Sequence, residues 1–100
     1  MRPMDPELLN EQCESVKRAC MDEDYYVLPR LFLNAAEQAG WIKNTVRARD
    51  EAVEEVFVFW AESVSLPHEL HDLVLRGAHF ARMPWDEKIK YKLATPFEGL

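Results

Sequence analysis

Three histidines have the clearest capacity for metal chemistry, because two of them, His68 and His71, are three residues apart. In a helix this spacing places both imidazoles on one face, where they could share a metal ion. His79 lies about 12 Å further along the axis than His71, beyond a common coordination sphere. Cys13 and Cys20 fall on an apolar helix face, and neither their spacing nor that of His68 and His71 matches a closed zinc site. We therefore predict no metal and no other cofactor, and keep a metal-binding regulator that uses His68 and His71 as an alternative.

Nucleophilic catalysis lacks its usual groups. The chain has three serines: Ser15 and Ser63 fall in predicted helices with no histidine close in sequence, and Ser65 is predicted to cap a helix. Serine-nucleophile, zinc-protease, calcium-loop and glycine-rich phosphate motifs are absent from the sequence, which has three glycines in all. Inward-facing Glu-x-x-His motifs of di-iron bundles are absent too. We therefore predict that the protein is not an enzyme.

The segment 50–64 carries the most informative pattern, because as a helix it has two opposed faces. Its apolar residues repeat at helical spacing and predict a core-facing side. These are Val53, Val56, Phe57, Trp60 and Val64, flanked by Ala52 and Phe59. The other side gathers four carboxylates around one apolar residue, namely Glu51, Glu54, Glu55 and Glu62 around Val58. We predict that this side docks on a larger protein with a basic surface.

A second candidate contact surface follows the first predicted helix. It combines an acidic turn with two tyrosines, and consists of Asp22, Glu23, Asp24, Tyr25 and Tyr26. Tyrosine beside charged residues is a common composition of contact hot spots. For both surfaces the alternative interpretation is a solvated helix side or a polar turn.

Direct nucleic-acid binding is not expected. The formal net charge is −6, from 18 acidic and 12 basic residues, and such a surface repels a phosphate backbone unless a basic patch overrides it. The basic residues gather only in two small groups beside acids. These are Lys43, Arg47 and Arg49, and Lys88, Lys90 and Lys92. A helix-turn-helix is disfavoured because the segment after Pro67 opens with His68, Glu69 and His71 in place of base-reading side chains.

The elements that position these residues are helices. Asp5-Pro6 starts the first one, which ends at the turn 22–24, and a connector then leads to a helix beginning near Pro29 and stopping at Gly40. Asp50 caps the third helix, and Ser65 or Leu66 caps a fourth that has Pro67 in its first turn.

The last segment, 85–94, has conflicting patterns. Trp85, Ile89 and Leu93 recur every four residues as in a helix, whereas 88–93 alternates as in a strand. Helix is the favoured interpretation. The predicted fold is therefore a compact all-α bundle of four to five short helices in a single domain, 1–100, with short flexible ends at 1–4 and 96–100. A small α+β fold with a C-terminal strand is the alternative.

A cytoplasmic protein is expected, because the sequence has neither a membrane-spanning apolar run nor a secretory signal. Cys13 and Cys20 lie about 10 Å apart along one helix, too far for a disulfide, and reduced thiols fit this compartment.

In size, acidity and lack of catalytic motifs the chain resembles the small inhibitors that phages and mobile elements direct at host systems, anti-CRISPR proteins among them. That resemblance implies a module that blocks a nucleic-acid-binding partner by shape and charge. A structural subunit or assembly factor that oligomerises through Trp41, Val58 or Trp85 is the alternative, and the oligomeric state is left open.

Overall fold

A computed structural model describes residues 2–43 and 50–94 of the chain, with side chains described as far as residue 90. Every regular element in these ranges is helical, so the all-α prediction is confirmed. The α+β alternative is wrong for the segment in question, since Trp85–Ala94 is a helix. The elements are α1 Pro6–Met21, the 3-10 turn η1 Tyr25–Val27, α2 Leu28–Gln38, α3 Asp50–Ser63, the 3-10 turn η2 His68–Leu70, α4 His71–Arg82 and α5 Trp85–Ala94.

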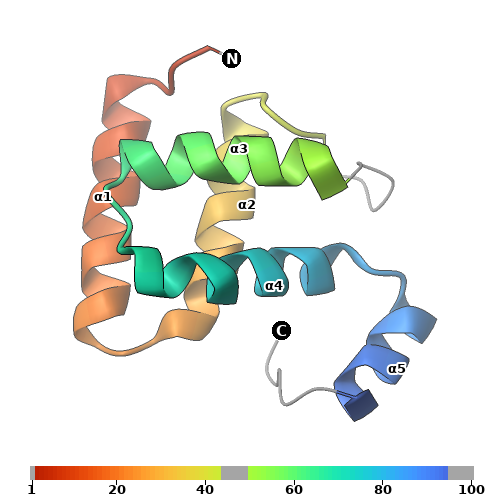
Figure 1. Cartoon of the computed structure of the whole chain (residues 1–100). Coiled ribbons are helices and arrows are strands. Elements are labelled where there is room, and N and C mark those ends of the chain that lie inside the picture. The colour runs from red at the N-terminus through yellow and green to blue at the C-terminus, as the bar shows by residue number, and fades with distance from the viewer. Residues whose placement is uncertain (1, 44–49, 95–100) are drawn as a thin grey trace.

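Four of the helices form two crossed layers (Figure 1). In one layer α1 and α2 run antiparallel, and in the other α3 and α4 run antiparallel across them. Helix α2 lies at the centre of this arrangement, because it packs against α1, α3 and α4. Each of these helices therefore needs one apolar face for the shared interior and leaves the other face to solvent.

The interior is built around three aromatic rings. Phe32 of α2 meets Phe57 of α3 edge to face at 5.4 Å between ring centroids, and lies 5.5 Å from Trp60 of α3. All three side chains are fully buried, and burial of such a side chain stabilises the fold by roughly 1.5–3 kcal/mol. The core-facing side predicted for the third helix is confirmed, since Val53, Val56 and Val64 are buried with Phe57 and Trp60.

Three helices end in the same way, with one residue in the left-handed conformation. After α2 this residue is Gly40 (φ 74°), as predicted, and the Trp41 N–H donates to the Ala36 carbonyl at 2.8 Å. After α1 and α3 the residues are Glu23 (φ 55°) and Ser65 (φ 56°). Ser65 thus ends α3. The prediction that Ser65 or Leu66 caps the next helix, with Pro67 in its first turn, is wrong, because Pro67 is itself the residue that precedes η2. The backbone bonds match a Schellman motif at all three ends.

The start of α2 also differs from the prediction. Leu28 was expected in the connector because a residue before proline avoids helical geometry. It is instead the first residue of α2 (φ −60°, ψ −45°) and is fully buried. The apolar burial of Leu28 offsets the steric preference against this conformation.

Residues at the N-terminus lie against the helical layers. Met4 is buried, and the Trp41 indole N–H donates to the Arg2 carbonyl at 2.8 Å. The indole of Trp41 meets the ring of Phe59 edge to face at 5.0 Å. Trp41 thus links the N-terminal segment 2–4, which we call the N-terminal strap, to α3. Flexibility at 1–4 stays a prediction, although the structure places Met4 of that segment in the core. Residues 96–100 lie outside the described residues.

Helix α5 extends away from both layers (Figure 1). It packs along none of the other described helices, although the Lys88 ammonium lies 5.8 Å from the centroid of the Phe80 ring. Trp85 is 76% exposed and Ile89 47% exposed. The folded core is therefore made by α1 to α4, and α5 is attached to it after Pro84.

Candidate protein-binding surface

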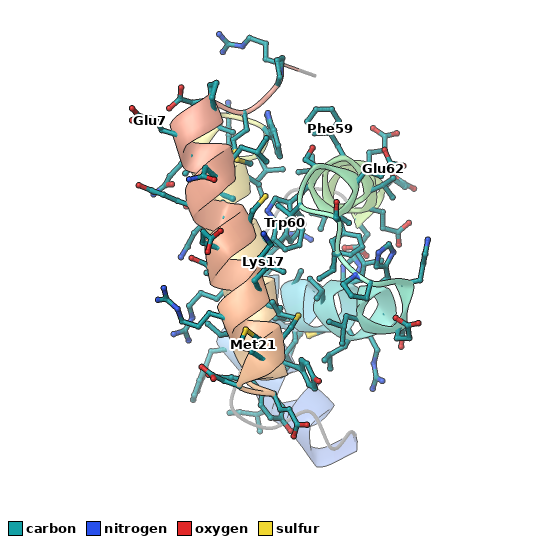
Figure 2. The ribbon with its side chains drawn as sticks, turned by 90° about the vertical axis from the view of Figure 1, so that its left-hand side faces the viewer. Glu7, Lys17, Met21, Phe59, Trp60 and Glu62 are labelled. Carbon is teal, nitrogen blue, oxygen red and sulfur yellow. The ribbon has the colours of Figure 1, made fainter. Side chains whose placement is uncertain are left out.

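The outward side of α3 forms a surface that we call the acidic face, consisting of Glu51, Glu54, Glu55, Val58 and Glu62. All five residues are exposed, and Val58 keeps half of its surface accessible. Figure 2 shows why: Trp60 points from α3 toward α1, whereas Glu62 points to the opposite side. The predicted residues therefore share one surface on a helix whose other side is fixed in the core.

One edge of the acidic face is tied to α4. Nδ1 of His79 donates to Oδ1 of Asp50 at 3.2 Å, and Nε2 of the same ring lies 3.9 Å from Oε1 of Glu54. An Arg82 guanidinium nitrogen lies 3.6 Å from the same Asp50 oxygen. Asp50 is the first residue of α3, and its carboxylate thus contacts two basic groups on α4. The Asp50 carboxylate is 79% exposed, and ion pairs to such an exposed group stabilise by roughly 0–1 kcal/mol.

The remaining carboxylates of the acidic face have a different environment. Within residues 2–43 and 50–94, Glu51, Glu55 and Glu62 form no ion pair. Their charges surround Val58 on a helix that cannot turn without disrupting the core. This part of the surface combines uncompensated negative charge with an apolar centre.

A groove of about 400 Å³ adjoins the acidic face where α3 ends. It is lined by Val58, Ala61, Glu62, Ser65, Leu66, His68 and His71. We call it the α3–η2 groove. Val58 and Glu62 belong to both features, so the acidic face continues into the groove.

The two histidine rings of the groove contact each other, with their planes tilted by 37°. The ring centroids of His68 and His71 lie 4.6 Å apart, and the His71 ring meets Phe57 edge to face at 5.3 Å. Nε2 of His71 lies 3.1 Å from the Leu66 carbonyl, which can only accept, so Nε2 carries the proton and donates. This nitrogen therefore has no free lone pair for a metal ion. In addition, the described part of the chain has no group of three His, Cys, Asp or Glu side chains that could hold a metal ion. Nothing in this geometry supports the metal-binding alternative.

The second predicted surface lies at the end of α1, and the structure does not bring it to the acidic face. Figures 1 and 2 place the end of α1, marked by Met21, and the Glu62 end of α3 at different levels of the molecule. Asp22, Glu23 and Asp24 are exposed and form the turn that ends α1. The tyrosines separate, since Tyr25 packs against the core and Tyr26 is 54% exposed. A cavity of about 210 Å³ beside this turn is lined by residues of α1, η1 and α2 together with Asp22 and Asp24.

Trp85 and Ile89 form an exposed apolar pair on α5. The sequence named Trp85 as one of three residues through which a structural subunit could oligomerise, but it did not name Ile89. The pair's spacing of four residues was visible in the sequence and indicates one helix face. Spacing alone predicts a face packed on the core, and only the arrangement of the helices exposes this one. The exposed face of α5 is therefore a third candidate contact surface, beside the acidic face and the turn after α1.

Among the described residues, no helix has both the length and the apolarity that crossing a bilayer requires. Comparisons with models of protein families, with curated proteins and with solved structures give no match to this chain.

Proposed function

We propose that the protein is a non-enzymatic binding module whose acidic face docks on a basic surface of a larger protein. The observation that carries the proposal is the set of exposed carboxylates around Val58, with Glu51, Glu55 and Glu62 in no ion pair within the described residues. A fixed helix face of this kind loses little conformational entropy on binding, and its charge steers a cationic partner toward it.

The finer form of the proposal is inhibition. A row of carboxylates on a rigid helix can occupy a cationic groove that otherwise holds nucleic acid, and the module then blocks that groove by shape and charge. Small inhibitors that phages and mobile elements direct at host systems, such as anti-CRISPR proteins, are the class that we propose. The site of action is the cytoplasm, where such a partner works.

A matched pair of double variants tests the acidic face. Glu51→Lys with Glu55→Lys changes two exposed residues in the first turns of α3, spaced by four. Glu7→Lys with Glu11→Lys makes the same exchange at the same spacing in the first turns of α1, and Figure 2 shows Glu7 on that helix. Each variant raises the net charge of −6 by four units, so a general charge effect appears equally in both.

We expect the α3 variant, used as bait in a lysate of the native host, to lose at least about tenfold in recovery of the partner, and the α1 variant to retain it. The recovered protein is then purified and tested for nucleic-acid binding, which the wild-type chain should displace and the α3 variant should not. Association should also weaken as salt is raised. Equal recovery by wild type and the α3 variant, with both folded by circular dichroism, would contradict the proposal.

A structural subunit is the second candidate, and the exposure of Trp85 and Ile89 favours it. In this function the apolar pair on α5 is covered by a second copy of the chain. Two α5 helices that pair antiparallel about a two-fold axis would bring the apolar residues of the two copies together. Sedimentation of the wild type and of an α5 variant tests this candidate.

A further inference from the structure

We propose that the α3–η2 groove receives an arginine side chain of the partner, an inference that rests on the proposed function of the acidic face. The groove opens from that face, because Val58 and Glu62 line both. Its volume of about 400 Å³ lies within the usual range of ligand clefts, roughly 300–1,000 Å³. A partner held on the acidic face thus has a recess beside it that a long side chain can enter.

The lining of the groove matches the two chemical parts of arginine. Val58, Ala61 and Leu66 supply apolar surface for the methylene stem. The Glu62 carboxylate can accept two N–H bonds from a guanidinium, a geometry that strengthens such pairs. The exposed imidazole of His68, which lines the groove, offers a flat face of the kind on which a guanidinium packs.

Lysine fits the same lining less well. Its ammonium is a compact and strongly hydrated charge, without a plane to stack on an imidazole or a fork to match a carboxylate. The groove therefore distinguishes between the two basic side chains, whereas the open part of the acidic face attracts both by charge alone. This distinction makes the proposal testable apart from general electrostatic attraction.

The wall of the groove at Leu66 and His71 is fixed before binding. His71 is held by its bond to the Leu66 carbonyl and by the Phe57 ring. The Leu66 N–H donates to the Ala61 carbonyl at 2.9 Å, which closes the turn at the end of α3. A preformed recess requires less ordering when the side chain enters, which favours affinity.

Two blocked peptides serve as probes: acetyl-Gly-Arg-Gly-Arg-Gly-amide and its lysine counterpart. Their dissociation constants are measured by following backbone amide shifts of the isotope-labelled full chain. We expect the arginine peptide to bind at least about fivefold tighter than the lysine peptide. The largest shifts should fall on Val58, Glu62, Leu66 and His71.

Glu62→Gln and His68→Ala should each weaken the arginine peptide by about fivefold, and should bring its affinity close to that of the lysine peptide. Glu55→Gln is the matched control, since Glu55 belongs to the acidic face but not to the groove; it should lower both peptides' affinities equally and by less than about twofold. Equal affinity of the two peptides for the wild type, or an unchanged preference in Glu62→Gln, would overturn the inference.

The two proposals fail separately. Neither Glu51 nor Glu55 lines the groove. If their double variant loses partner recovery and the two peptides bind the wild type equally, the arginine site is refuted and the proposed function stands. An arginine preference that depends on Glu62, combined with unchanged recovery in that double variant, would refute the acidic-face docking and leave the recess as a guanidinium site.

Discussion

At the scale of single residues, backbone strain is concentrated where two helices end. Glu23 and Ser65 occupy the left-handed region, which costs a residue with a Cβ atom about 1–2 kcal/mol. Gly40 fills the same position after α2, where a Cβ would meet no atom within 4 Å. A side chain at position 40 would therefore be disfavoured only by the left-handed backbone conformation, and the same conformation disfavours Glu23 and Ser65.

Glycine should consequently stabilise the two strained turns. We expect Glu23→Gly and Ser65→Gly each to raise the free energy of unfolding by about 0.5–1 kcal/mol, and Gly40→Ala to lower it by about 1 kcal/mol. Urea unfolding followed by circular dichroism measures all three. Glu11→Gly, in the interior of α1, is the opposing control and should destabilise by about 1 kcal/mol. Destabilisation by both glycine exchanges at the turns would show that the side chains of Glu23 and Ser65 outweigh the strain.

At the scale of elements, α5 is the helix that the rest of the fold supports least. Ten residues are too few for a stable isolated helix in water, since about 12–15 are needed even for favourable sequences. Acidic Asp86 and Glu87 in its first turn oppose fraying through the helix dipole. Exposed Trp85 and Ile89 add no stability until another surface covers them, which is the reason to expect association through this element.

An α5 variant, Trp85→Ser with Ile89→Ser, should therefore be monomeric where the wild type sediments as a dimer. The control exchanges two other exposed apolar residues, Met21→Ser with Tyr26→Ser, which are 83% and 54% exposed and lie away from α5. It should sediment as the wild type does. A wild type that stays monomeric at high micromolar concentration, or an α5 variant that still dimerises, would refute the subunit candidate.

The elements also show how far the sequence determined the fold. The core side of α3 was predictable because helical geometry alone sets the directions of Val53, Phe57 and Trp60. Ser65 was misassigned because a serine between two helical patterns suits the end of one and the start of the next. Its φ of 56° and the bond from the Leu66 N–H to the Ala61 carbonyl place it at the end of α3. Leu28 was misplaced for a related reason, since its burial depends on packing that no local rule describes.

The candidate site also has one part that the sequence predicts and one part that it does not. Exposure of the acidic face follows from periodicity, so its residues could be chosen from the sequence, and their role in binding stays a prediction. The α3–η2 groove could not be anticipated, because His68 and His71 reach Val58 only through the turn at residues 64–67. Likewise, the contact of His79 with Asp50 joins residues 29 apart and requires α3 and α4 to lie side by side.

At the scale of the whole molecule, the packing argues for a single cooperative unit. The buried cluster draws Val16 and Ala19 from α1, Phe32 from α2, Trp60 from α3 and Val74 from α4. No layer holds a separate interior of its own within this cluster, so separating the two layers exposes the apolar faces of both. A chain of 100 residues built in this way is expected to unfold in one step.

Two of the three tryptophans make this prediction measurable. Trp60 is fully buried between the layers, and Trp41 fixes the N-terminal strap beside α3, whereas Trp85 lies on the exposed helix. In a Trp85→Phe variant, fluorescence therefore reports the interior and circular dichroism reports all the helices. We expect the fluorescence transition and the main circular-dichroism transition in urea to share one midpoint, because the helices of both layers lose their support together, whereas any separate loss of α5 should come at lower urea. A fluorescence transition at lower urea than the loss of helix would contradict the prediction, since the interior would then open while helices persisted.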